Sequence, residues 1–230
     1  MSSIVIRKGM LSVDPTMECI DEAVASKANL IISHHALIHE SFFKIRELAF
    51  EKMRLLTENN IWVYVTGDPW NHSNQGITES VCQALRLEPK ETYTVSNFQG
   101  NEIPVGRICN VGGVRKFNSI LDQAKKIIGA CSITYKGAPE RIHNKILVIG
   151  GRIDSIQPVI AMLEGGIDLL VTGEISSEII TILSELHLAF IELSHHATDI
   201  LGMSKLKLLL SLKHPNVTFT LHDENPVQRV

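Results

Sequence analysis

Short apolar runs recur along the chain and alternate with segments in which apolar residues are three or four positions apart. The runs that predict strands are 3–7, 29–33, 61–66, 107–112, 145–149, 168–171, 188–193 and 217–221, with weaker strand patterns at 92–98 and 131–136. The helical spacing predicts helices over 15–27, 41–59, 77–87, 117–129, 155–165, 176–187 and 198–214, whereas 67–76 has the composition of a loop. Regular alternation of strands and helices predicts an α/β fold.

The middle of the chain departs from this rhythm. We expect residues 93–136 to form a smaller middle segment between two α/β halves, 1–92 and 137–230, that share one functional site. Asp14 is the predicted cap of the first helix, with Pro15 at its first position and Lys27 near its end.

Polar residues follow the predicted strands directly. They are His34-His35, Asp68 with Asn71-His72, Thr172-Gly173-Glu174, His195-His196 and Asp223-Glu224-Asn225. In α/β sheets ligands bind outside the carboxyl ends of the strands, so these side chains are expected to gather at one rim. This convergence predicts a metal site, because histidine is a common metal ligand near neutral pH.

The adjacent pair His34-His35 has two interpretations. Neighbouring residues of a strand point to opposite faces, so one buried and one exposed histidine is the simpler outcome. A bend where the strand ends would instead let both rings face one cavity.

His195 and Asp199 are four residues apart at the start of a predicted helix, which places an imidazole and a carboxylate on one helical face. Alternatively, Asp199 is not a ligand, and its negative charge only stabilises the amino end of the helix through the helix dipole. Glu174 is either an acid or base of the site or a residue that starts a helix.

Composition and charge exclude several classes. The net charge is −3 and aromatic residues are 5% of the chain, which argues against a nucleic-acid partner. The four cysteines, Cys19, Cys82, Cys109 and Cys131, have no CxxC spacing and are expected to be reduced and mostly buried. We find no signal peptide, membrane-spanning run or nucleotide-binding glycine motif, and we expect a cytoplasmic protein.

Four blocks of the sequence together resemble the NIF-three-like family of dinuclear-metal proteins, often labelled GTP cyclohydrolase I type 2 homologues. The blocks are 28–35, 61–87, 168–176 and 194–199, and the ending 223–227 also matches. The resemblance implies two similar α/β domains, a metal site at the carboxyl ends of the strands between them, and a homohexameric ring. It also implies two divalent metal ions per subunit, zinc, iron or manganese, with ligands at His34, His35, His195 and Asp199.

The sequence departs from the family pattern in three places. Gly67 and Asn71 stand where the family has a histidine and a bridging aspartate, so Asp68 or His72 is expected to complete the ligand set. Asp199 stands where glutamate is usual. We expect the chain to start later than the family pattern, without its leading helix, and Asp14 stands where an aspartate of the first strand is expected.

These features predict a metal-dependent hydrolase with metal ligands His34, His35, Asp68, His72, His195 and Asp199, and with Glu174 as the catalytic proton relay. A GTP cyclohydrolase-type reaction, or hydrolysis of a nucleotide or phosphoester, is the expected activity. Two alternatives stay open: a metal-binding ring that acts through protein partners without turnover, and a metal-free structural relative.

Overall fold

The computed structural model describes residues 5–38, 46–97, 99–110, 115–128 and 132–223. The chain forms two compact units. The first comprises residues 1–70 and 203–224, and the second comprises residues 71–202 and 225–230. The boundaries fall inside two helices, α3 (Gly67–His72) and α8 (His195–Lys213).

The first unit contains a four-stranded parallel sheet in the order β10-β1-β2-β3. The strands are β1 (Lys8–Ser12), β2 (Leu30–Ser33), β3 (Trp62–Val65) and β10 (Thr218–His222), with helices α1 (Met17–Ala25) and α2 (Arg46–Glu58) between them. Ser12 is opposite both Ser33 and His222, so the carboxyl ends of these strands meet at one edge of the sheet.

Two expectations at the start of the chain are wrong. The first strand is Lys8–Ser12, because pairing with β10 begins at Lys8 and pairing with β2 begins at Gly9. Residues 5–7 of the predicted strand 3–7 are not in a strand, and residues 3 and 4 lie outside the described residues. Helix α1 is capped by Thr16, whose hydroxyl accepts a hydrogen bond from the Cys19 amide at 3.1 Å, and not by Asp14.

Two expectations around residue 65 are also wrong. The strand predicted as buried, β3, is an edge strand whose Trp62 and Tyr64 are 55% and 62% exposed. The predicted loop begins with helix α3, in which Asp68 lies in the first turn and Pro69 is close to the start, both favourable there.

The second unit contains a six-stranded mixed sheet in the order β4-β5-β7-β8-β9-β6. The strands are β4 (Glu88–Ser96), β5 (Glu102–Asn110), β6 (Thr134–Lys136), β7 (Lys145–Ile153), β8 (Leu169–Ile175) and β9 (Ala189–Glu192). The neighbouring pairs β7–β8 and β8–β9 are parallel, whereas β4–β5, β5–β7 and β6–β9 are antiparallel. The segment 93–136 lies within this unit, and its separation as a smaller middle part stays a prediction.

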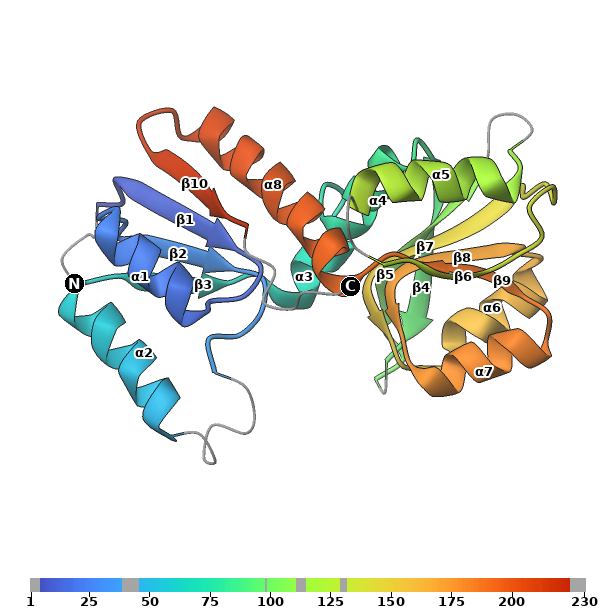
Figure 1. Cartoon of the computed structure of the whole chain (residues 1–230), viewed down its shortest axis with the longest axis horizontal. Coiled ribbons are helices and arrows are strands. Elements are labelled where there is room, and N and C mark those ends of the chain that lie inside the picture. The colour runs from blue at the N-terminus through green and yellow to red at the C-terminus, as the bar shows by residue number, and fades with distance from the viewer. Residues whose placement is uncertain (1–4, 39–45, 98, 111–114, 129–131, 224–230) are drawn as a thin grey trace. The chain divides into compact units, whose positions relative to one another are not determined.

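Helices cover both faces of the second sheet. Figure 1 shows α4 (Ile77–Ala84) and α5 (Phe117–Ile128) on one face and α6 (Gln157–Gly165) and α7 (Ser177–Glu185) on the other. Along β7, Ile146 and Val148 pack with α4 and α5, whereas Leu147 and Ile149 pack with α6 and α7. Burial on both faces explains why β7 and β8 are continuous apolar runs.

The α/β class is therefore confirmed, with one parallel and one mixed sheet. Cys19, Cys82 and Cys109 are buried as expected and are not in disulfides, while Cys131 lies outside the described residues. The described residues contain no helix with the length and hydropathy of a membrane span.

Candidate metal-binding residues

The first unit presents His34 and His35 where β2 ends. The amides of both residues donate hydrogen bonds to the Val13 carbonyl, at 3.1 and 3.0 Å, so the backbone turns at this point. The two rings consequently lie side by side, with centroids 4.8 Å apart and planes tilted by 49°. The bend that would turn both rings in one direction is thus present.

Each of these rings is held through its Nδ1 atom. His34 Nδ1 is 3.2 Å from Thr66 Oγ1, and His35 Nδ1 is 2.8 Å from Asp14 Oδ1. A histidine whose Nδ1 is held by a hydroxyl or carboxylate keeps Nε2 for a metal ion, and the carboxylate increases the basicity of the ligand. Asp14 thus fixes the ring of His35, a contact that the sequence indicated only through the position of Asp14 after the first strand.

His222 repeats this arrangement at the end of β10. Its Nδ1 lies 2.6 Å from Glu22 Oε2, and the residue is buried. No metal signature was recognisable around His222 in the sequence, because its partner Glu22 is 200 residues away along the chain.

The second unit contains a cluster formed by His195, Glu174 and Asp199. His195 is the first residue of α8, and its Nε2 is 3.3 Å from Asp199 Oδ2, one helical turn further on. Its Nδ1 is 3.0 Å from Glu174 Oε2, at the end of β8. The predicted helical pairing of His195 with Asp199 is present, and the structure adds Glu174 to it.

The His195–Asp199 pair has the geometry of two ligands on one ion. Donor atoms at about 2.0–2.2 Å from a metal are roughly 3 Å apart in a tetrahedral or octahedral shell, and the observed separation is 3.3 Å. The Asp199 side chain is 0% exposed. A buried carboxylate is costly unless a cation or strong donors compensate it, so a divalent ion fits this position.

The backbone around His195 is closely packed. A Cβ on Gly173 would lie 2.6 Å from the Gly151 carbonyl oxygen and 3.2 Å from the His195 Cα. Ser194, the residue before α8, has a φ of +150°, which L-residues rarely adopt. The start of α8 is thus fixed by close backbone contacts.

The other two predicted ligands lie near the unit boundary. Asp68 is exposed in the first turn of α3, and His72 ends that helix. The buried guanidinium of Arg107 donates to the His72 carbonyl at 3.0 Å and to Glu79 at 3.0 Å, and so fixes the end of α3. This role of Arg107 was not indicated by any pattern in the sequence. The roles of Asp68 and His72 as ligands stay predictions.

The donor types of His34, His35 and Asp199 are suited to a metal ion. The assignment of all six predicted ligands, and of Glu174 as a catalytic group, remains a prediction. Glu174 contacts the Nδ1 atom of His195, which is the position of a residue that orients a ligand.

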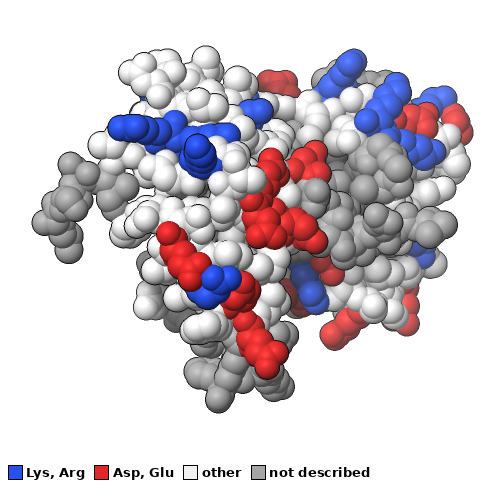
Figure 2. Space-filling model, turned by 60° about the vertical axis from the view of Figure 1, so that its left-hand side comes forward, with Lys and Arg blue, Asp and Glu red and all other residues white. Residues whose placement is uncertain are grey.

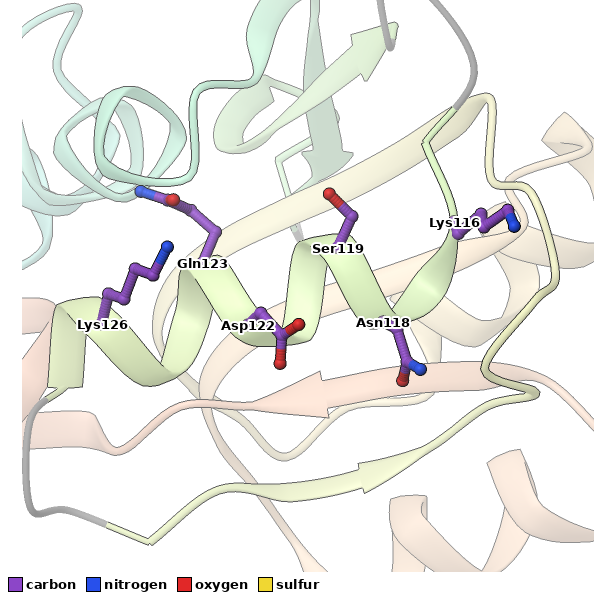
Figure 3. A pocket seen from close by; sticks show the side chains of 6 residues that line it. All are labelled: Lys116, Asn118, Ser119, Asp122, Gln123 and Lys126. Atoms are coloured by element: carbon purple, nitrogen blue, oxygen red, sulfur yellow. The ribbon is translucent and has the colours of Figure 1, made fainter.

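A separate hollow of about 490 Å³ lies along α5. Its lining side chains are Lys116, Asn118, Ser119, Asp122, Gln123 and Lys126. Figure 3 shows that they project in different directions along the helix, so they do not converge on one ligand. On the face seen in Figure 2, the described Lys and Arg side chains form separate groups, with Asp and Glu between them, and no continuous basic track.

Comparison with known proteins identifies the family of the whole chain. The family model described as Duf34/NIF3 (NGG1p interacting factor 3) matches residues 3–226. A protein of Clostridium acetobutylicum named GTP cyclohydrolase 1 type 2 homolog is 26% identical over 193 residues, 83% of this chain and 71% of that protein. A Methanocaldococcus jannaschii protein of the same name is 24% identical over 207 residues, 90% of this chain and 80% of that protein.

Solved structures share the fold. A hypothetical protein of Staphylococcus aureus has a TM-score of 0.80 and 17% identity, covering 100% of this chain and 89% of that chain. Reduced HcgD from Methanocaldococcus jannaschii has a TM-score of 0.77 and 22% identity. The alignment covers 95% of this chain and 84% of that chain. Because the family model spans nearly the whole sequence, the chain belongs to the Duf34/NIF3 family, as its sequence blocks predicted.

Proposed function

We propose that this chain is a metal-dependent hydrolase that binds divalent ions through His34, His35, His195 and Asp199. The observation that carries the proposal is the buried Asp199 carboxylate, 3.3 Å from the Nε2 atom of His195. Imidazole and carboxylate ligands suit zinc, iron or manganese.

Two divalent ions, when bound, would supply an activated water and polarise the phosphoryl or ring-carbon centre under attack. Residues of the chain would orient the histidine ligands for this step. Asp14 and Glu174 accept hydrogen bonds from the Nδ1 atoms of His35 and His195, so the Nε2 atoms carry the lone pairs. The Glu174 side chain is 39% exposed, so it can exchange a proton with solvent during turnover.

The proposed substrate is a nucleotide or another phosphoester. This part of the proposal comes from relatives named GTP cyclohydrolase 1 type 2 homolog. We also propose a ring of six copies, as the family resemblance implies, which light scattering after size-exclusion chromatography would test.

The first experiment is elemental analysis of protein purified without chelators or affinity metal. We expect close to two ions per chain in the wild type, loss in His195→Ala, and no change in His214→Ala, which replaces an exposed histidine. One ion per chain would mean that Asn71 leaves a position empty. No ion after reconstitution with zinc, iron(II) or manganese would contradict the proposal.

A metal-binding ring without turnover is the second candidate. It is favoured by Gly67 and Asn71, because a neutral amide bridges two cations less well than a carboxylate. Hydrolysis of nucleotides by the metal-loaded protein, abolished in His34→Ala, would refute this second candidate. Intact metal content without turnover of any nucleotide or phosphomonoester would support it.

A further inference from the structure

The end of β7 carries an irregularity beside the His195 cluster. Ile149 pairs with Thr172 and Arg152 pairs with Glu174, so Gly150 and Gly151 together face the single residue Gly173. Gly151 has a φ of +78°, which glycine adopts readily. Such bulges redirect the side chain that follows them and are common beside active sites.

The bulge lies against the side chains of His195 and Asn71. A Cβ on Gly151 would be 3.8 Å from His195 Nε2 and 3.6 Å from Asn71 Nδ2. The residue that follows, Arg152, pairs with Glu174 in the sheet and thus lies beside the His195 cluster.

The guanidinium of Arg152 makes one long ion pair, with Glu174. Its Nη1 atom is 3.8 Å from Glu174 Oε1, its side chain is 51% exposed, and within the described residues it donates no hydrogen bond. By contrast, Arg107 donates to Glu79 at 3.0 Å and Arg115 donates to the Leu85 carbonyl at 2.9 Å. Arg152 thus retains N–H donors that can reach a ligand.

We infer that Arg152 binds a phosphate group of the substrate. This inference rests on the proposed function, because the ligand would lie beside His195. A guanidinium binds a phosphate through two parallel hydrogen bonds. A phosphate monoester carries a charge of about −1.5 to −2 near neutral pH, so it competes effectively with the single charge of Glu174.

The test uses inorganic phosphate as the probe. Isothermal titration calorimetry would measure phosphate binding to wild type, Arg152→Gln, Arg152→Lys and Arg141→Gln, each in metal-free and metal-loaded form. Arg141 is an exposed arginine before the amino end of β7 and serves as the matched control. We expect Arg152→Gln to weaken binding at least about tenfold and Arg152→Lys to lie between it and wild type. Arg141→Gln should bind like wild type.

Metal content, measured on the same samples, separates the two proposals. If no ion binds but phosphate binding depends on Arg152, the proposed function fails and the phosphate site stands. Equal phosphate affinity in wild type and Arg152→Gln, or no measurable affinity in either metal state, would overturn the inference. It would also be overturned if Arg152→Gln lost its metal, because Arg152 would then act by positioning Glu174 and His195.

Discussion

At the scale of single residues, the described histidines are distinguished by what holds their Nδ1 atoms. His35, His195 and His222 each face a carboxylate through Nδ1, at distances of 2.8, 3.0 and 2.6 Å. These partners come from other elements of the fold, so each histidine has a fixed orientation before any ligand binds. A carboxylate also holds Nδ1 of the buried His143, so this contact fixes the orientation of a ring without by itself identifying a metal ligand.

The first prediction concerns Asp14. Asp14→Asn keeps the size of the side chain but removes the charge that orients His35 and increases its basicity. Metal affinity is expected to fall about 10–100-fold, with little change in fold. Competition titration with a chromogenic chelator would measure the affinity. Asp122→Asn, on the exposed face of α5, is the control, and equal affinities in the two variants would argue against a role for Asp14.

His143 is a different case, because it is structural. Its ring is 0% exposed, packs against Phe117 and has Nδ1 3.3 Å from Asp168. Burial lowers the pKa of His143 below its ordinary value of 6.5, although the Asp168 carboxylate opposes this shift. The folded state therefore favours the neutral ring.

The second prediction follows from the sign of this shift. Below pH 6.5 the unfolded chain binds a proton at His143 more readily than the folded chain, so stability falls as the pH drops from 6.5 towards the folded pKa. His143→Gln removes this contribution. Urea unfolding at pH 7.5 and pH 5.5 is expected to show a smaller loss of stability in His143→Gln than in wild type. An equal loss in both proteins would contradict the prediction.

At the scale of elements, strand ends and helix starts build the site. The sequence predicted most strands and helices of the described residues, because alternating burial leaves a clear apolar pattern. The prediction that β3 is buried was wrong, because an apolar edge strand has the same composition as a buried strand. The sequence pattern also missed α3, whose residues have the composition of a loop but follow β3 closely with Pro69 near the helix start.

The third prediction tests the contact between β8 and the start of α8. Gly173→Ala would place a Cβ 2.6 Å from both the Gly151 carbonyl oxygen and Thr198 Oγ1. Because backbone atoms cannot move aside cheaply, we expect about 1–3 kcal/mol of destabilisation, together with weaker metal binding. Chemical denaturation and elemental analysis would measure the two effects. Gly165→Ala, whose Cβ would meet only Ile167 at 3.7 Å, should be nearly neutral in metal binding.

At the scale of the whole molecule, the proposed metal binding is coupled to the stability of the folded chain, because the proposed ligands are far apart in the sequence and come together only on folding. An ion that binds the folded chain and not the unfolded chain stabilises it by about 2.7 kcal/mol at one hundred times its dissociation constant. For a chain of 230 residues this corresponds to a rise in Tm of about 5–10 °C.

The fourth prediction is therefore a metal-dependent Tm. Differential scanning fluorimetry should show this rise with zinc or manganese in wild type, and a much smaller rise in His195→Ala. The His214→Ala variant should respond like wild type. An identical rise in wild type and His195→Ala would show that the stabilising ion binds elsewhere.

The sequence by itself determined the α/β class, the family and the polar residues at the strand ends, because burial periodicity and short motifs are local properties. Only the tertiary structure decided which groups hold the histidines. Asp14, Glu22 and Glu174 are 21, 200 and 21 residues from the rings that they contact. It also revealed the bulge that precedes Arg152. Two adjacent glycines form a bulge only when they lie opposite a single residue of the neighbouring strand, here β8, and this pairing is not visible in the sequence. Distances between side chains depend on how strands pair and where helices begin, and a linear pattern does not contain them.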